Sequence, residues 1–213
     1  AAVEPFSYDL DKRFKIFHEL MARKVRNILL VSTPYDAYML EEDGRLSERI
    51  INEYRGLNLS RPPRLTWVSS VDDALQALDH NAFDMVITMP CIGNTNADAM
   101  ARVIKRRAPD LPVILLSHGA LPVGECYADP SADASGGIDR TFIWTGNSDI
   151  LLALVKSAED RMNALPDSQQ AGIRVILFIE DSPFYISSLL PILYKELVFQ
   201  TQAVMEEGLN EEH

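Results

Sequence analysis

Residues 83–89 read FDMVITM, and Pro90 follows them directly. A short, continuous apolar run of this kind is typical of a β-strand that is buried on both faces, and proline ends such a strand. Four other segments are also predicted to be strands: residues 27–32 (NILLVS), 65–69, 111–117 (LPVILLS) and 138–144. Strands without a solvent face indicate a sheet that is covered by helices on both sides.

The segments between these runs supply the helices. Helical spacing of apolar residues, or charged and capping residues at the ends, occurs in residues 38–54, 71–78, 97–107 and 149–162. Residues 119–137 are rich in Gly, Ala, Ser, Asp and Pro, so any helix there is expected to be short or irregular. The alternation predicts an α/β fold, a doubly wound parallel sheet of five strands, with ligand sites at the carboxyl ends of the strands.

Three further segments flank this predicted domain. Residues 1–24 have apolar residues at helical spacing and predict an N-terminal helix. Residues 165–172 (LPDSQQAG) have the composition of a linker. Residues 173–180 (IRVILFIE) predict an extra C-terminal strand, which a long helix from about residue 184 to 209 follows. The predicted organisation is a helix over 1–24, a domain over 25–164, a linker over 165–172 and a further unit over 173–213.

The composition excludes several classes of protein. The chain has 213 residues, of which 47% are hydrophobic, and this is enough for a real core. The formal net charge of −11 argues against nucleic-acid binding and against attachment to an anionic membrane. No apolar run approaches the ~20 residues of a membrane span, and no signal peptide is expected. Two cysteines fit a reducing compartment, so we expect a soluble, cytoplasmic protein.

The residues at the ends of the predicted strands decide the chemistry. They are Ser32 and Thr33, Met89, Ser117 and His118, and Trp144. Ser117 and His118 are adjacent in sequence and no acid is placed to orient the imidazole, so we expect no nucleophile–base pair. The sequence has no glycine-rich nucleotide loop and no zinc-type ligand spacing, and therefore gives no case for a cofactor.

The middle of the predicted domain resembles the receiver domain of response regulators. The resemblance covers residues 71–119 and rests on Asp73-Ala74-Leu75, on residues 83–87 and on residues 109–117 (PDLPVILLS). It implies a flavodoxin-like receiver fold, and it places Ser117 at the switch hydroxyl of that family.

The positions that carry phosphorylation in receivers differ here. The resemblance puts Met89 at the phosphate-accepting aspartate, Ser32 and Thr33 at the acidic pair that binds magnesium, and Trp144 at the lysine that ends the fifth strand. Phosphoryl transfer to a carboxylate needs that carboxylate as nucleophile and hard oxygen ligands for Mg²⁺. We therefore interpret residues 25–164 as a pseudo-receiver that is not an enzyme. Trp144 either fills the vacated acidic pocket or is an ordinary core aromatic.

Residues 176–183 (ILFIEDSP) resemble the opening of a second receiver, which this chain does not complete. In a complete receiver, Glu180 and Asp181 would be Mg²⁺ ligands. In this chain the third ligand is missing, so a solvent-facing acidic turn is expected. An unpaired strand is an association hazard, and we expect it either to join the first sheet or to form a homodimer together with the long helix.

A wider resemblance concerns the parent protein. Residues 17–25 (FHELMARKV) and 41–50 (EEDGRLSERI) resemble the N-terminal regulatory region of phosphoenolpyruvate synthase-like proteins, which carry a PEP/pyruvate-binding domain of the pyruvate, phosphate dikinase type. It implies that this chain is a regulatory fragment whose partners are other domains of the parent, and that any kinase chemistry lies in those domains.

Two other functions stay open. The chain could be a genuine phosphorelay receiver that uses a downstream aspartate or a displaced one, such as Asp36, Asp84 or Asp98. It could also be an unrecognised enzyme on a flavodoxin-like sheet, with a ligand at the strand ends.

Overall fold

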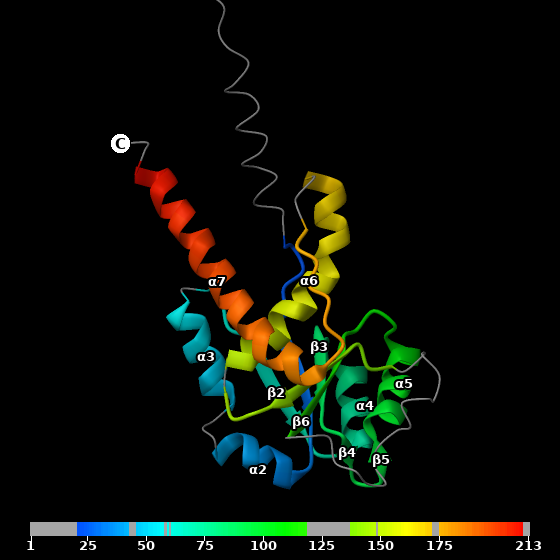
Figure 1. Ribbon diagram of the computed structural model, residues 1–213. Helices are drawn as coiled ribbons and strands as arrows, with labels where there is room; N and C mark the ends of the chain where they lie inside the picture. Colours follow the sequence, from blue (N-terminus) through cyan, green and yellow to red (C-terminus); the bar gives the residue numbers. More distant parts are fainter. Residues whose placement is uncertain are drawn as a thin grey trace, which may run out of the picture.

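The computed structural model describes residues 21–42, 46–57, 59, 61–118, 137–147, 149–171 and 175–210. Its centre is a parallel sheet of five strands in the order β2-β1-β3-β6-β7 (Figure 1). The strands are β1 (Asn27–Val31), β2 (Arg64–Val68), β3 (Met85–Thr88), β6 (Val113–His118) and β7 (Arg140–Trp144). This is the strand order of the flavodoxin-like doubly wound fold, so the predicted fold class is confirmed.

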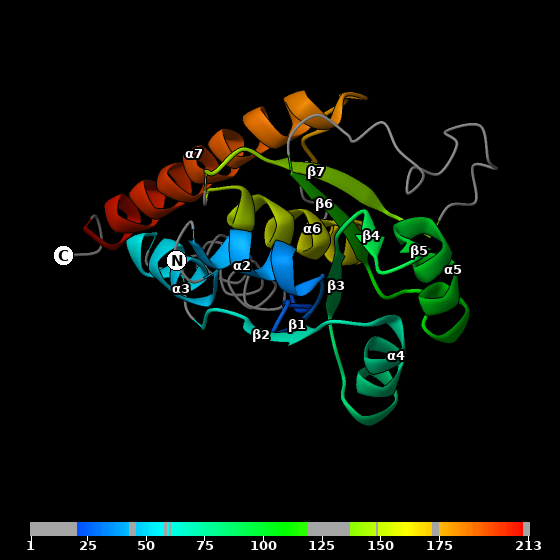
Figure 2. The same ribbon diagram turned by 90° about the horizontal axis from the view of Figure 1, so that it is seen from below.

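Helices cover both faces of the sheet, which explains why the central strands β1 and β3 are apolar and almost entirely buried. They are α2 (Pro34–Glu42), α3 (Leu46–Gly56), α4 (Val71–His80), α5 (Ala97–Arg107), α6 (Asp149–Ala171) and α7 (Pro183–Asn210). Figure 2 shows α4 and α5 on one face and α3 and α6 on the other, while α7 runs along the β7 edge. A small hairpin, β4 (Cys91–Ile92) and β5 (Thr95–Asn96), joins β3 to α5.

The core lies between the sheet and its helices. All four residues of β3 are buried, and so are Ile28 to Val31 of β1. α5 contributes Met100 and Ile104, and α6 contributes Leu151 and Leu154, all at most 1% exposed. Gly137 lets the chain pass close to α5 before β7 begins, because a Cβ there would lie 2.5 Å from the Ala101 carbonyl carbon.

α6 is longer than the sequence predicts. The expected helix ends at residue 162 and the expected linker covers 165–172, but the structure keeps 165–171 in the helix, with Pro166 inside it. Asn163 and Asp167 explain the extension, because these buried side chains, like Glu159 one turn earlier, accept hydrogen bonds from the backbone that leads into β1. Glu159 accepts from Val25 N at 3.0 Å, Asn163 from Arg23 N at 2.9 Å and Asp167 from Met21 N at 3.0 Å.

Of the predicted helix over residues 1–24, residues 1–20 lie outside the described part of the chain. Met21 lies in a turn and residues 22–24 are not helical. The backbone N–H groups of Met21, Arg23 and Val25 donate to side chains of α6, so this segment leads into β1 as a non-helical chain that α6 holds in place.

The predicted strand over 173–180 is wrong for the residues that the structure describes, since residues 175–182 belong to no strand. The reason lies at β7, the edge of the sheet that such a strand would join. The Ser187 hydroxyl of α7 accepts a hydrogen bond from Ile143 N at 2.7 Å and donates one to the Pro183 carbonyl at 2.6 Å. α7 thus occupies the place that an added strand would take.

α7 is bound to the domain by side chains along its length. Leu190 is 3% exposed and belongs to the main core. The Lys195 ammonium contacts Asp149 at 2.5 Å and Glu53 at 3.2 Å. Burial lowers the pKa of Lys195, but its hydrogen bonds to these two carboxylates outweigh burial and the pKa is raised. The long helix is therefore part of the packed domain.

We predict that Ser187→Ala lowers the free energy of unfolding by about 1 to 3 kcal/mol, because it leaves the buried Ile143 N–H without a partner. Ser188→Ala is the matched control. The Ser188 hydroxyl is exposed and donates only to the Phe184 carbonyl of its own helix. Urea unfolding of the two variants checks this. Equal free energies of unfolding would contradict the role of the Ser187 hydroxyl as the partner of the β7 edge.

Candidate functional site

The carboxyl ends of the strands bring the predicted site residues to one edge of the sheet. The β1–β3 register pairs Val31 with Thr88, and the β6–β7 register pairs His118 with Trp144. Ser32 follows β1 and Met89 follows β3, so both leave the sheet at this edge. The arrangement agrees with the edge that the strand pattern predicts for a ligand site.

Met89 stands at the centre of this edge. It is fully buried, and its N–H donates to the Val31 carbonyl at 3.2 Å. The neighbouring Thr88 is also fully buried, and its hydroxyl donates to the Met89 carbonyl at 3.1 Å. The end of β3 therefore presents a thioether, which is a poor nucleophile toward phosphate and a poor ligand for Mg²⁺.

Ser32 and Thr33 make local hydrogen bonds. Ser32 is fully buried, and its hydroxyl accepts from the Trp67 indole N–H at 2.9 Å. The Thr33 hydroxyl donates to the Asp36 carboxylate at 2.7 Å and accepts from Asp36 N at 3.1 Å, as a residue that caps α2. Sequence reasoning missed the indole bond, because no local pattern links positions 32 and 67.

The end of β6 holds two polar atoms without a partner. The Ser117 hydroxyl and the His118 Nε2 atom are buried and make no hydrogen bond with the residues that the structure describes. An unsatisfied buried hydroxyl lowers the free energy of unfolding, so a specific reason for its presence is expected. No sequence signal indicates this property of Ser117.

Trp144 ends β7 and is 4% exposed. It packs within the main hydrophobic core, as the interpretation of an ordinary core aromatic requires. The other interpretation, in which the indole fills an acidic pocket that was lost, stays a prediction.

The three displaced aspartates occupy different places. Asp84 lies before β3, at the opposite edge of the sheet, and its carboxylate accepts from Arg26 N and Asn27 N at 2.8 Å each. Asp98 is in the first turn of α5. Asp36, held by Thr33, and Asp98 both lie toward the carboxyl edge, since α5 begins where Ala97 N donates to the Pro90 carbonyl at 3.0 Å.

Glu180 and Asp181 are placed as a turn before α7. The Glu180 carboxylate accepts from Ser182 N at 2.9 Å, and Asp181 is exposed. Within the part of the chain that the structure describes, no three His, Cys, Asp or Glu side chains come together as a metal site. A magnesium site at these residues therefore depends on ligands from elsewhere.

Two observations bear on the protein's surroundings. Among the described residues, none of the helices has the length and apolar character needed to cross a bilayer. Cys91, at the start of β4, is disulfide-bonded. Disulfides are typical of oxidising compartments, so this bond does not support the expected reducing compartment.

No protein family matches this sequence, and no curated protein does. Several solved structures are similar. The N-terminal domain of a response regulator/sensory box/GGDEF 3-domain protein from Carboxydothermus hydrogenoformans is 16% identical with a TM-score of 0.48, over 66% of this chain and 99% of that one. The signal receiver domain of a putative Luxo repressor protein from Vibrio parahaemolyticus is 16% identical with a TM-score of 0.47, over 70% and 98%. A response regulator receiver protein from Sinorhizobium medicae is 21% identical with a TM-score of 0.45, over 64% and 95%. Likeness at this level concerns the fold alone.

Two buried serines at the same edge give a prediction about stability. Ser117→Ala removes a hydroxyl without a partner, so we expect the free energy of unfolding to stay the same or to rise by about 1 kcal/mol. Ser32→Ala leaves the Trp67 N–H without its acceptor, and because Trp67 is partly exposed we expect a loss of only about 0.5 to 1.5 kcal/mol. Urea unfolding measures both, and a clear loss in Ser117→Ala would show that this hydroxyl has a partner.

Proposed function

We propose that this chain is a receiver-like signalling module that does not accept phosphate on its five-stranded domain and acts through protein contacts. The observation that carries the proposal is Met89, fully buried at the end of β3 where a receiver needs its aspartate. The strand order and the resemblance of residues 71–119 to receivers support the signalling class.

The neighbouring side chains agree with this proposal. Ser32 and Thr33 are engaged in hydrogen bonds and carry no charge that could hold Mg²⁺. Trp144 provides no ammonium group to stabilise a bound phosphoryl group. The transfer of a phosphoryl group depends on positioning and on charge compensation, and both are missing from these residues.

The outer side of α7 supports action through contacts. Tyr185, Leu189, Ile192 and Phe199 are 45–66% exposed, and they are separated by four, three and seven residues. That spacing places them on one face of the helix and is typical of a surface that packs against another helix. A solvent-exposed apolar stripe of this kind marks an interaction surface.

The proposed partners of the stripe are a second copy of this chain and the other domains of a larger protein. The resemblance of residues 17–25 and 41–50 to the regulatory regions of phosphoenolpyruvate synthase-like proteins supports such a parent. The catalytic chemistry of that parent would lie outside this chain.

One observation favours the alternative, a genuine phosphorelay receiver with a displaced or downstream acceptor. Ser117 has a buried hydroxyl with no partner, at the position of the family's switch hydroxyl. Such a group is available to a phosphoryl group that binds transiently. Asp36 and Asp98 are the candidate acceptors toward this edge within the described residues.

Treatment with acetyl phosphate and Mg²⁺ tests the proposal. We expect intact-mass spectrometry to show no covalent phosphate on residues 25–164, while a receiver that has its aspartate and is treated in parallel becomes phosphorylated. A phosphate on this domain would overturn the proposal. Asp36→Asn, Asp84→Asn and Asp98→Asn would then locate the acceptor.

Sedimentation tests the α7 stripe. We expect wild-type protein to dimerise and Ile192→Glu to be monomeric, because a carboxylate in an apolar seam must lose its hydration. Thr201→Glu adds the same charge at an exposed position outside the stripe and should leave the dimer intact. A monomeric wild type would contradict the proposed homodimer.

A further inference from the structure

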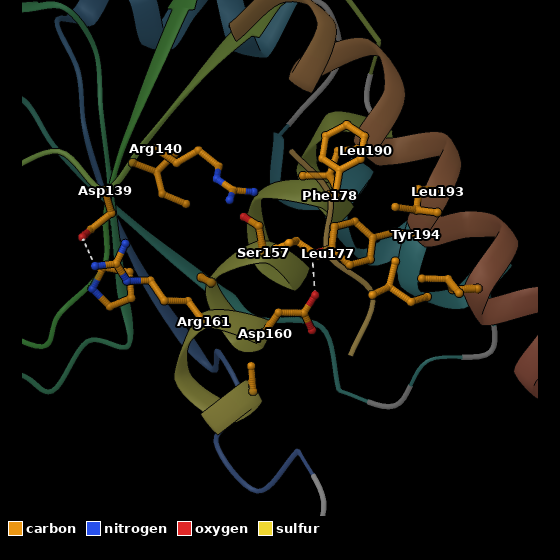
Figure 3. A pocket seen from close by; sticks show the side chains of 16 residues that line it. Asp139, Arg140, Ser157, Asp160, Arg161, Leu177, Phe178, Leu190, Leu193 and Tyr194 are labelled. Atoms are coloured by element: carbon orange, nitrogen blue, oxygen red, sulfur yellow. Dashed lines mark hydrogen bonds and ion pairs between the residues drawn. The ribbon is translucent and has the colours of Figure 1, made fainter. Parts of the chain in front are cut away.

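A cavity lies away from the carboxyl edge of the sheet. It has a volume of about 370 Å³ and opens between α6, α7, the segment 176–178 and the beginnings of β6 and β7 (Figure 3). Arg140, the first residue of β7, lines it, whereas Trp144 at the other end of that strand belongs to the edge described above. The volume lies within the range of cavities that bind small molecules.

Two carboxylates of this cavity already have partners. Asp139 contacts the Lys105 ammonium at 2.7 Å and the Arg161 guanidinium at 2.8 Å, and it also accepts from Val113 N at 2.7 Å. Asp160 accepts from the Tyr194 hydroxyl at 2.6 Å. Burial, together with this hydrogen bond, raises the pKa of Tyr194, so the hydroxyl keeps its proton at neutral pH.

Arg140 has no such partner. Its guanidinium makes no hydrogen bond or ion pair with any residue that the structure describes, although it offers five N–H donors. In Figure 3 its side chain extends from β7 into the cavity, on the side of Ser157. The Ser157 hydroxyl donates to the Leu154 carbonyl at 3.0 Å, so its oxygen is still able to accept a hydrogen bond.

The remaining wall of the cavity is apolar. Its largest apolar side chains include Ile176, Leu177, Phe178, Leu190, Leu193 and Leu197. All six side chains come from α7 or from the segment before it. The cavity thus combines one uncommitted positive charge with an apolar wall, which is the usual composition of a site for an amphipathic ligand.

We propose that this cavity binds a small amphipathic carboxylate. Arg140 takes the carboxylate in a two-pronged hydrogen bond, and the apolar body of the ligand lies against Phe178 and the leucines of α7. The proposal goes beyond the proposed function and does not depend on it, since no residue of the carboxyl edge takes part.

Such a ligand would touch both α6 and α7. Anything that binds the docked state of α7 and not the undocked state stabilises docking by mass action. Ligand binding would thereby stabilise the docked position of the helix that carries the apolar stripe. It would in this way influence the protein contacts that the stripe makes.

Titration with phenylpropionate tests the site, with phenylpropanol as the neutral probe of the same shape. We expect saturable changes in the amide NMR signals of residues 139–141, 157–161 and 190–194 of the full chain. We expect phenylpropionate to bind about tenfold more tightly than phenylpropanol, because only the carboxylate uses the guanidinium.

Three variants make the result specific. Arg140→Gln, at an exposed position, should abolish the preference for the carboxylate without unfolding the domain. Arg64→Gln is the matched control, since Arg64 is also an exposed arginine that begins an edge strand, on the other side of the sheet. Ala164→Phe, at an exposed α6 position that lines the cavity, should weaken both probes.

The proposal is overturned if phenylpropionate shows no saturable binding, if the two probes bind equally well, or if Arg140→Gln and Arg64→Gln behave alike. Signal changes confined to the carboxyl edge would also overturn it. None of these outcomes affects the acetyl phosphate experiment, so the two proposals fail separately.

Discussion

The entry of the chain into the sheet depends on a match between two repeats. Alternate residues of an extended chain recur every ~6.6 Å, and every fourth residue of an α-helix recurs every ~6.0 Å. Glu159, Asn163 and Asp167 are spaced by four along α6, and they meet the N–H groups of residues 21, 23 and 25. The face of α6 thereby supplies the hydrogen-bond acceptors that a neighbouring strand would otherwise supply to these N–H groups. This match also fixes α6, on which α7 packs.

The sequence predicts the central strands most directly, because helices cover both faces there and burial appears as apolar runs. The sequence-based prediction fails where contacts between residues far apart in the chain override the local composition. Pro166 and its polar neighbours indicate a linker, yet α6 continues because Asp167 has a partner 146 residues away. The run 173–180 has the composition of a strand, but the neighbouring edge is taken by Ser187 of α7.

The candidate site, like the fold, can be predicted from the sequence only in part. Positions at strand ends follow from the strand pattern, and the absence of carboxylates at Ser32 and Met89 is visible in the sequence. The pairing of Ser32 with the Trp67 indole and the isolation of the Ser117 hydroxyl depend on packing, which no local pattern encodes. The uncommitted guanidinium of Arg140 likewise becomes visible only when α7 closes one wall of its cavity.

The cover that α7 places over β7 has a consequence for the behaviour of the protein in solution. Open edges of sheets recruit strands from other molecules and are a common start of aggregation. Here the protection rests on a docked helix and on the hydroxyl of Ser187. Release of α7 alone, with the core still folded, would expose the edge of β7 beside the apolar residues 175–179, most of which are already exposed. Damage to this helix would then be seen as turbidity that grows with protein concentration, before any loss of secondary structure.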